Sequence, residues 1–207
     1  FEAPHVSIFV DVDATRTMEF VKRLKTSPTF EGVKVTPLLI LAKAIIWATA
    51  RNPQVNSSWT DSEILIKRYI NLGIAAATPR GLMVPTIFNA DALSILDISA
   101  QAQSLGAACQ KGTVSPDQLK DATITVSNLG SLGIESFTPV INPPQTCILG
   151  VNTLGTSFRL VDGQAVPYPS MNLSLTADHR AIDGAPAARL LKDLKTALEN
   201  FSILLMK

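Results

Sequence analysis

The segment from Asp178 to Gly184 reads Asp-His-Arg-Ala-Ile-Asp-Gly and places one of only two histidines of the chain between acidic residues. Histidine has the side-chain pKa nearest neutrality, so a positioned imidazole can take a proton from a thiol or a hydroxyl at working pH. His179 is therefore a candidate general base. The same residues also allow a structural interpretation, in which Asp183 caps a helix, Arg180 pairs with a carboxylate, and the histidine serves only local packing.

The elements on either side would hold this histidine at a junction between a strand and a helix. Residues 174–176 are typical of the end of a strand, and apolar residues recur at helical spacing over 186–201. Asp183 and Gly184 lie where a helix cap and a tight turn are needed. A fixed position at such a boundary is compatible with catalysis but does not by itself require it.

The rest of the chain predicts an α+β fold. Strands are expected over residues 5–11, 63–67, 70–77, 82–87, 122–127, 146–154 and 169–177, with a hairpin turn at Asp162-Gly163 between residues 158–160 and 164–166. Helices are expected to about residue 25 after an Asp13 cap, and over 36–51 and 94–110, with a short helical turn from 115. The order is not a strict alternation, so a mixed β-sheet with helices packed on one side is favoured over a doubly wound parallel sheet.

Composition excludes several function classes. With 207 residues, 46% of them hydrophobic, and a formal net charge of +1, the chain can bury one substantial core and carries no electrostatic footprint for nucleic acid. The most apolar stretch, residues 38–50, is shorter than a bilayer span and contains Lys43, so no membrane segment is expected. Cys109 and Cys147 lie far apart, which indicates reduced thiols. No metal is expected, because two histidines and two separated cysteines lack ligand spacing.

The segment at 178–184 resembles the C-terminal signature of the dihydrolipoyl acyltransferases, which form the core of 2-oxo acid dehydrogenase complexes. The shorter pattern His-x-x-x-Asp-Gly also occurs in chloramphenicol acetyltransferases and in condensation domains of peptide synthetases, which usually lack the flanking Asp and Arg. Further segments are similar to the family in the same order, at residues 4–7, 71–75, 78–85, 125–130 and 137–144. The resemblance implies a chloramphenicol-acetyltransferase-like fold, with residues 1–207 as one catalytic domain that is N-terminally trimmed and lacks lipoyl and subunit-binding domains.

The implied enzyme is a dihydrolipoamide acyltransferase, which moves an acyl group directly from a dihydrolipoyl thioester to coenzyme A. A free thiol has a pKa of about 8.5, so the reaction needs a base, which we expect to be His179. By the resemblance, Ser127 stabilises the oxyanion of the tetrahedral intermediate, although a serine at a strand end could instead satisfy a turn. Asp183 is expected to support the site, and some relatives carry asparagine there. Asn128 and Gly130 are weaker candidates for substrate binding.

The resemblance also implies the partners. Coenzyme A is expected as a substrate with no binding residue assigned, and the lipoyl group is carried on a domain outside this chain. The chain is expected to form a homotrimer in which the histidine of one subunit faces the serine segment of the next, and then a cubic core of 24 chains joined through apolar residues 203–206, with a free trimer as the alternative. A lipoyl domain, a 2-oxo acid decarboxylase and a dihydrolipoyl dehydrogenase are the other implied partners, in a bacterial cytoplasm or a mitochondrial matrix.

Two other functions stay open at this point. One is a chloramphenicol-acetyltransferase-like enzyme with a small free acceptor, and the other is a non-catalytic structural core subunit, against which the presence of His179 and Ser127 speaks. The acyl group is also open, because a pocket separates apolar acyl groups by only about 1–3 kcal/mol. Acetyl is the default and branched-chain acyl the next choice. A succinyl enzyme would need a cation near the acyl pocket, and none can be placed.

Overall fold

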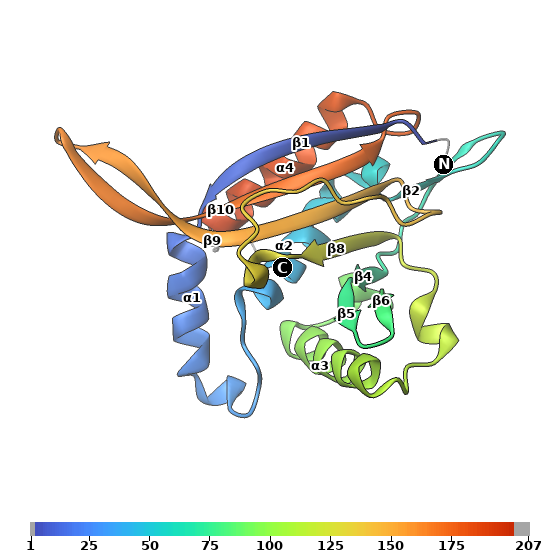
Figure 1. Cartoon of the computed structure of the whole chain (residues 1–207), viewed down its shortest axis with the longest axis horizontal. Coiled ribbons are helices and arrows are strands. Elements are labelled where there is room, and N and C mark those ends of the chain that lie inside the picture. Colours follow the sequence, from blue (N-terminus) through green and yellow to red (C-terminus); the bar gives the residue numbers. More distant parts are fainter. Residues whose placement is uncertain (1–2, 201–207) are drawn as a thin grey trace.

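A six-stranded mixed sheet organises the computed structural model, which describes residues 3–200 (Figure 1). The strands lie in the order β1 (His5–Asp13), β10 (Gln164–Asp178), β9 (Cys147–Val161), β8 (Ile124–Asn128), β4 (Leu72–Ile74) and β7 (Thr86–Ile87). β8 runs parallel to both β9 and β4, and the other neighbours are antiparallel. The expectation of a mixed sheet is therefore confirmed.

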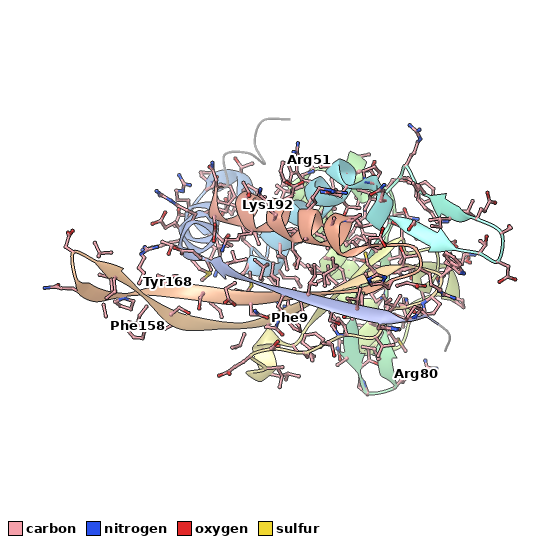
Figure 2. The ribbon with its side chains drawn as sticks, turned by 90° about the horizontal axis from the view of Figure 1, so that it is seen from above. Phe9, Arg51, Arg80, Phe158, Tyr168 and Lys192 are labelled. Atoms are coloured by element: carbon pink, nitrogen blue, oxygen red, sulfur yellow. The ribbon has the colours of Figure 1, made fainter. Side chains whose placement is uncertain are left out.

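Helices cover one face of this sheet. The longer helices are α1 (Thr15–Lys25), α2 (Pro37–Arg51), α3 (Ile95–Lys111) and α4 (Gly184–Glu199). Seen from above, α4 lies on one side of β1 while Phe9 is labelled on the other side (Figure 2). α2 is apolar around most of its circumference, as expected for a helix buried between the sheet and other helices, and Ile40 and Ile45 are fully buried in it.

Alternation along the strands decides which side chains reach the helices. In β10, Leu173 and Leu175 belong to the core, while Ser174 and Thr176, which alternate with them, point to the opposite face. The chain between β8 and β9, residues 129–146, crosses that opposite face (Figure 1). Because this segment covers them, the two hydroxyl side chains are buried although they do not face the helices.

The two longest strands form a hairpin that projects beyond the rest of the sheet (Figure 1). Its turn is Asp162-Gly163 with φ of 50° and 78°, the left-handed pair that a two-residue hairpin turn requires. The expectation of shorter strands with breaks was wrong, because β9 and β10 are each continuous over 15 residues. Pro167 and Pro169 are tolerated where β10 is an edge strand, since its pairing with β1 ends at Ser170.

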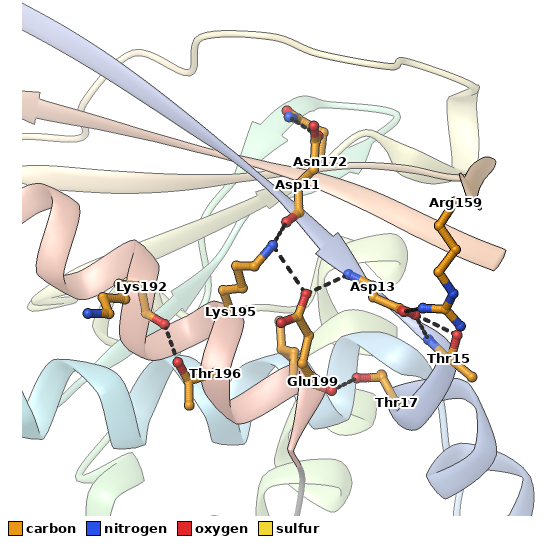
Figure 3. A network of polar contacts seen from close by, with 11 residues as sticks. Asp11, Asp13, Thr15, Thr17, Arg159, Asn172, Lys192, Lys195, Thr196 and Glu199 are labelled. Atoms are coloured by element: carbon orange, nitrogen blue, oxygen red, sulfur yellow. Dashed lines mark hydrogen bonds and ion pairs between the residues drawn. The ribbon is translucent and has the colours of Figure 1, made fainter. Parts of the chain in front are cut away.

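A polar network ties the root of this hairpin to the body (Figure 3). Arg159 of β9 donates to the Asp13 carboxylate at 2.6 Å, and Asp13 N donates to Glu199 Oε1 of α4 at 2.9 Å. The Asp13 carboxylate also accepts from Thr15 N at 2.9 Å. Asp13 therefore braces the start of α1, but the N-cap position itself is Ala14, one residue later than expected.

Several expected elements differ in the structure. The strand expected at 70–77 is divided into β4 and β5 (Ala76–Thr78), and the one expected at 82–87 into β6 (Gly81–Met83) and β7, because β5 and β6 form a separate hairpin and Pro85 interrupts the pairing. The strand expected at 63–67 is β3 (Ile64–Ile66), and its partner β2 (Ser57–Trp59) was not expected. The last helix, expected over 186–201, is α4 and ends at Glu199, with Asn200 as its C-cap. The apolar tail at 203–206 lies outside the described residues.

Candidate active site

His179 lies in a tight turn that connects β10 to α4. Asp178 O accepts hydrogen bonds from Ala181 N at 3.0 Å and from Ile182 N at 2.9 Å, and His179 N donates to Pro4 O at 2.9 Å. The backbone of the histidine is thus fastened to the chain just before β1. The imidazole is exposed, and it forms no hydrogen bond with any other residue in the described range, so it is available to a group from outside this chain.

The two neighbours of His179 are joined to each other. Arg180 Nε donates to Asp178 Oδ1 at 3.0 Å and its Nη2 donates to Oδ2 at 2.7 Å, while Arg180 N donates to Oδ1 at 3.1 Å. Burial of the Asp178 carboxyl raises its pKa, but these hydrogen bonds and the Arg180 charge lower it more, so the net pKa lies below the ordinary value. The expectation that Arg180 pairs with a carboxylate is confirmed.

Asp183 occupies the N-cap position of α4 with an extended backbone, as expected. Its side chain, however, forms no capping hydrogen bond, and only its carbonyl oxygen bonds into the helix, accepting from Ala187 N at 3.3 Å. The carboxylate is exposed, and Asp183 follows His179 by four positions. It is therefore not committed to stabilising its own helix.

Ser127 lies near the end of β8, on the sheet face that residues 129–146 cover. It pairs with Gly150, which pairs with Ser174, so the three positions share one face of the sheet. A side chain at position 150 would collide with Ser174 Oγ and come within 3.2 Å of the Phe137 ring. Glycine at position 150 therefore allows the Ser174 hydroxyl and the Phe137 ring to pack closely against the strand beside Ser127.

Asn128 and Gly130 form a tight turn directly after Ser127. Asn128 Oδ1 accepts from Gly130 N at 2.9 Å, the pattern of an Asx-turn. Both residues also line an open cavity of about 460 Å³ whose other walls come from α1, α2 and β9, including Met18 and Leu38. The two weaker sequence candidates thus border a mostly apolar space on the helix side of the sheet, and Ser127 is not among the residues that line it.

The structure does not bring Ser127 and His179 together within one chain. Ser127 is two strands from β10, opposite Ser174, and His179 follows Ser174 by five residues. With a strand spacing of about 4.8 Å and a rise of about 3.3 Å per residue, their Cα atoms lie roughly 19 Å apart. A site that uses both side chains must combine two copies of the chain.

The cysteines are unsuited to nucleophilic chemistry. Cys147 is fully buried in β9, and burial raises its pKa to about 12. Burial also raises the pKa of Cys109. Both thiols are free and stay protonated at neutral pH. Within residues 3–200 there is no group of three His, Cys, Asp or Glu residues that could hold a metal ion, and no helix long and apolar enough to span a membrane.

Sequence reasoning missed two residues near these side chains. Trp59 of β2 lies under the Arg180 guanidinium, with Arg180 Cζ 4.9 Å from the ring centroid. No local sequence pattern pointed to Trp59, and the strand that carries it, β2, was not predicted. Phe137, beside Gly150, belongs to the segment 137–144 that carried the family resemblance and could have been found from it.

Comparison with solved structures defines the class of fold. Chloramphenicol acetyltransferase superimposes with a TM-score of 0.64 at 15% identity, over 96% of this chain and 90% of that one. The expected chloramphenicol-acetyltransferase-like fold is confirmed. A family model described as 2-oxoacid dehydrogenases acyltransferase (catalytic domain) matches residues 1–206. The chain therefore belongs to this family of acyltransferase domains.

Relatives within the family are more similar. The dihydrolipoyllysine-residue acetyltransferase component of the pyruvate dehydrogenase complex of Bacillus subtilis is 38% identical over 99% of this chain. The chain spans about half the length of such curated relatives, 47% of this one. The dihydrolipoamide acetyltransferase of Azotobacter vinelandii and a cubic core of the pyruvate dehydrogenase multienzyme complex each superimpose with a TM-score of 0.94 at 34% identity, over 99% of this chain and 85% of theirs.

Proposed function

We propose that residues 1–207 form one catalytic domain of a dihydrolipoamide acyltransferase, which transfers an acyl group from a dihydrolipoyl thioester to coenzyme A within a 2-oxo acid dehydrogenase complex. Membership of the acyltransferase family supports this activity. Relatives from Bacillus subtilis and Staphylococcus aureus are named as acetyltransferase components of pyruvate dehydrogenase complexes, and these names support acetyl as the acyl group over a branched-chain one.

His179 is the proposed general base, and Ser127 is the proposed hydrogen-bond donor to the oxyanion. Asp183 is proposed to support the site. The Azotobacter vinelandii structure is described as an investigation of a serine, a histidine and an asparagine in the catalytic mechanism of that enzyme. Its serine and histidine are separated by the same number of positions as Ser127 and His179, and its asparagine follows the histidine by four positions, as Asp183 does here. This agreement in spacing supports the three assignments.

The chemistry follows from these positions. His179 takes the proton of the coenzyme A thiol, and the thiolate sulfur attacks the carbonyl carbon of the dihydrolipoyl thioester. The tetrahedral oxyanion accepts a hydrogen bond from Ser127, a contribution typically worth about 10²–10³ in rate. When the intermediate collapses, the bond to the dihydrolipoyl sulfur breaks and that sulfur takes the proton back from His179. The buried, protonated Cys147 and Cys109 offer no alternative acyl carrier.

Two copies must meet to form this site. The strand register is the single observation that carries the shared site, because it places Ser127 two strands from β10 and opposite Ser174, five residues before His179. Ideal strand geometry converts this register into a separation of roughly 19 Å between the Ser127 and His179 Cα atoms. The imidazole is exposed and has no hydrogen-bond partner among residues 3–200, which is consistent with a role against a neighbouring subunit. We assign substrate binding to Asn128 and Gly130, which form the turn directly after Ser127.

The proposed assembly is a homotrimer that builds a cubic core of 24 chains. The high structural similarity to a cubic pyruvate dehydrogenase core supports the cube over a free trimer. A lipoyl domain carrying the acyl group, a 2-oxo acid decarboxylase and a dihydrolipoyl dehydrogenase are the proposed partners. The bacterial relatives support a cytoplasmic location.

Deleting residues 202–207 tests the proposed cube. The mass in light scattering should fall from that of the cube to that of the trimer, and a trimer mass before deletion would contradict the cube.

Complementation between inactive variants tests the function and the shared site together. We expect Ser127→Ala to lose about 10²–10³-fold in turnover, and His179→Ala to lose several orders of magnitude, in transfer from S-acetyl-dihydrolipoamide to coenzyme A. Mixing the two variants under reassembly conditions should restore part of the activity, because some interfaces then pair an intact serine with an intact histidine. Each variant reassembled with itself is the control. Mixed trimers that are confirmed by mass but stay inactive would contradict a site between chains.

A further inference from the structure

The turn that carries His179 is closed by its own neighbours. Arg180 binds both carboxylate oxygens of Asp178 through its guanidinium and one of them through its backbone N–H. Since the residues before and after His179 are thereby joined, the ion pair fixes the direction in which the histidine leaves the backbone. Any motion of the Arg180 side chain would be transmitted to His179 through a single peptide bond.

Trp59 lies on the other side of this guanidinium. The indole ring stands 4.9 Å from Arg180 Cζ, within the range of a cation–π contact. The strand that carries Trp59 is anchored close by, because Ser57 Oγ and Thr146 Oγ1 are 2.8 Å apart and Thr146 O accepts from Asp178 N at 2.8 Å. Ser57, two residues before Trp59, and Asp178 are therefore both bonded to Thr146.

The arrangement restrains a side chain that would otherwise be mobile. Asp178 exposes only 5% of its side chain, whereas Arg180 exposes 31%, so the cationic end of the pair is the one that water can reach. An arginine side chain has many rotamers, and a planar guanidinium stacks readily on an aromatic face. The indole therefore selects the rotamer in which Arg180 reaches the buried carboxylate.

We propose that Trp59 is a positioning residue for the acyl transfer reaction, which acts through the Asp178–Arg180 pair to hold His179 in the orientation of the base. The proposal rests on the proposed function of His179. Trp59 is therefore assigned a part in the chemical step, and its replacement is expected to change kcat and not substrate affinity.

Steady-state kinetics of Trp59 variants test this. Trp59→Leu should lower kcat about tenfold while KM for coenzyme A and for S-acetyl-dihydrolipoamide stays within about twofold, because a small misplacement of a catalytic group costs rate and not binding. Trp59→Phe keeps an aromatic face and should retain kcat within about twofold of the unsubstituted protein. Trp47→Leu is the matched control, since the Arg51 guanidinium also lies 4.9 Å from its ring but pairs with Asp193 of α4 instead of with the turn.

A second measurement separates the possible outcomes. In Trp59→Leu the amides of Ala181 and Ile182, which bond to Asp178 O, should exchange with solvent faster than in the unsubstituted protein or in Trp47→Leu. An unchanged kcat in Trp59→Leu would overturn the assignment whatever the exchange rates are. An equal loss of kcat in Trp47→Leu would also overturn it, since general destabilisation would then be the cause. Absence of turnover in the unsubstituted protein would instead overturn the proposed function, and this assignment with it.

Discussion

Asp13 and Arg159 are 146 positions apart in the sequence, yet the Arg159 guanidinium donates to the Asp13 carboxylate at 2.6 Å (Figure 3). The contact joins the end of β1 to the point where the β9–β10 hairpin leaves the sheet. Burial raises the pKa of Asp13, but hydrogen bonds from Thr15 and Arg159 lower it more, so its net pKa lies below the ordinary value. Arg159 also lies over the Tyr168 ring at 5.0 Å, so it contacts both strands of the hairpin root and the body.

The Arg159 contact should orient the hairpin more than it stabilises the fold. Arg159→Gln should lower the free energy of unfolding by no more than about 1 kcal/mol, because the Arg159 side chain is 51% exposed and solvent screens the pair. Amides of residues 154–168 should nevertheless exchange faster. Urea denaturation and amide exchange check the two parts, with Arg16→Gln as the control, whose ion pair with Glu19 lies on α1 alone. Unchanged exchange would contradict an orienting role.

Position 150 should not accept a side chain. Gly150→Ala places a methyl group against Ser174 Oγ and the Phe137 ring, so it should destabilise the chain by about 1–3 kcal/mol and, by displacing these neighbours, also reduce acyl transfer at Ser127, which pairs with position 150. Gly155→Ala is the matched control, because it lies on the same strand with nothing within 4 Å of the added Cβ. Urea denaturation and turnover are measured on both. Equal behaviour of the two variants would show that the space at Gly150 is not restrictive.

The Asp178–Arg180 ion pair should make the free energy of unfolding depend on pH in the acidic range. Asp178 has a folded-state pKa below its unfolded value of about 3.9, so its contribution is fully present above pH 4 and is lost as the pH falls through the folded pKa. Asp178→Asn should cost on the order of 2 kcal/mol at pH 7, because charge-assisted hydrogen bonds to a buried carboxylate are lost. The difference from the unsubstituted protein should shrink below pH 4.

Urea denaturation at pH 7, 5 and 3 measures this dependence. Asp13 titrates in both proteins and therefore cancels from the difference. Asp117→Asn serves as the control, since its pair with Lys120 is exposed and solvent screens it, so the substitution should leave stability almost unchanged. A stability difference for Asp178→Asn that stays constant down to pH 3 would mean that its carboxylate is not the titrating group.

The thiols should be inert while the chain is folded. Because burial raises the pKa of Cys147 to about 12 and also raises that of Cys109, neither should be alkylated by iodoacetamide at pH 7.5 in the native protein, and both should react in urea. Cys147→Ala should retain turnover, because the proposed transfer passes directly between the two substrate thiols. Mass spectrometry of protein incubated with S-acetyl-dihydrolipoamide alone should show no acetylated cysteine. An acetylated Cys147 would indicate an acyl-enzyme instead.

Local sequence patterns determined most of the elements and one half of the site. Ser94, where the third helix was expected to begin, is the N-cap of α3 and forms a capping box with Asp97. Asp162-Gly163 forms the expected hairpin turn. The turn of His179 at the junction of β10 and α4 was equally predictable. Each of these features depends on residues within a few positions of one another, so the local sequence is sufficient to predict it.

Only the tertiary structure decided the relationships between distant residues. The register Ser127–Gly150–Ser174 places the serine far from His179 in its own chain, and the Ser174 hydroxyl and the Phe137 ring lie closely against Gly150. Likewise Trp59 meets Arg180 because β2 packs beside the start of β9. Strand register and packing between segments are set by the burial and hydrogen bonding of the whole sheet, and no short stretch of sequence encodes them.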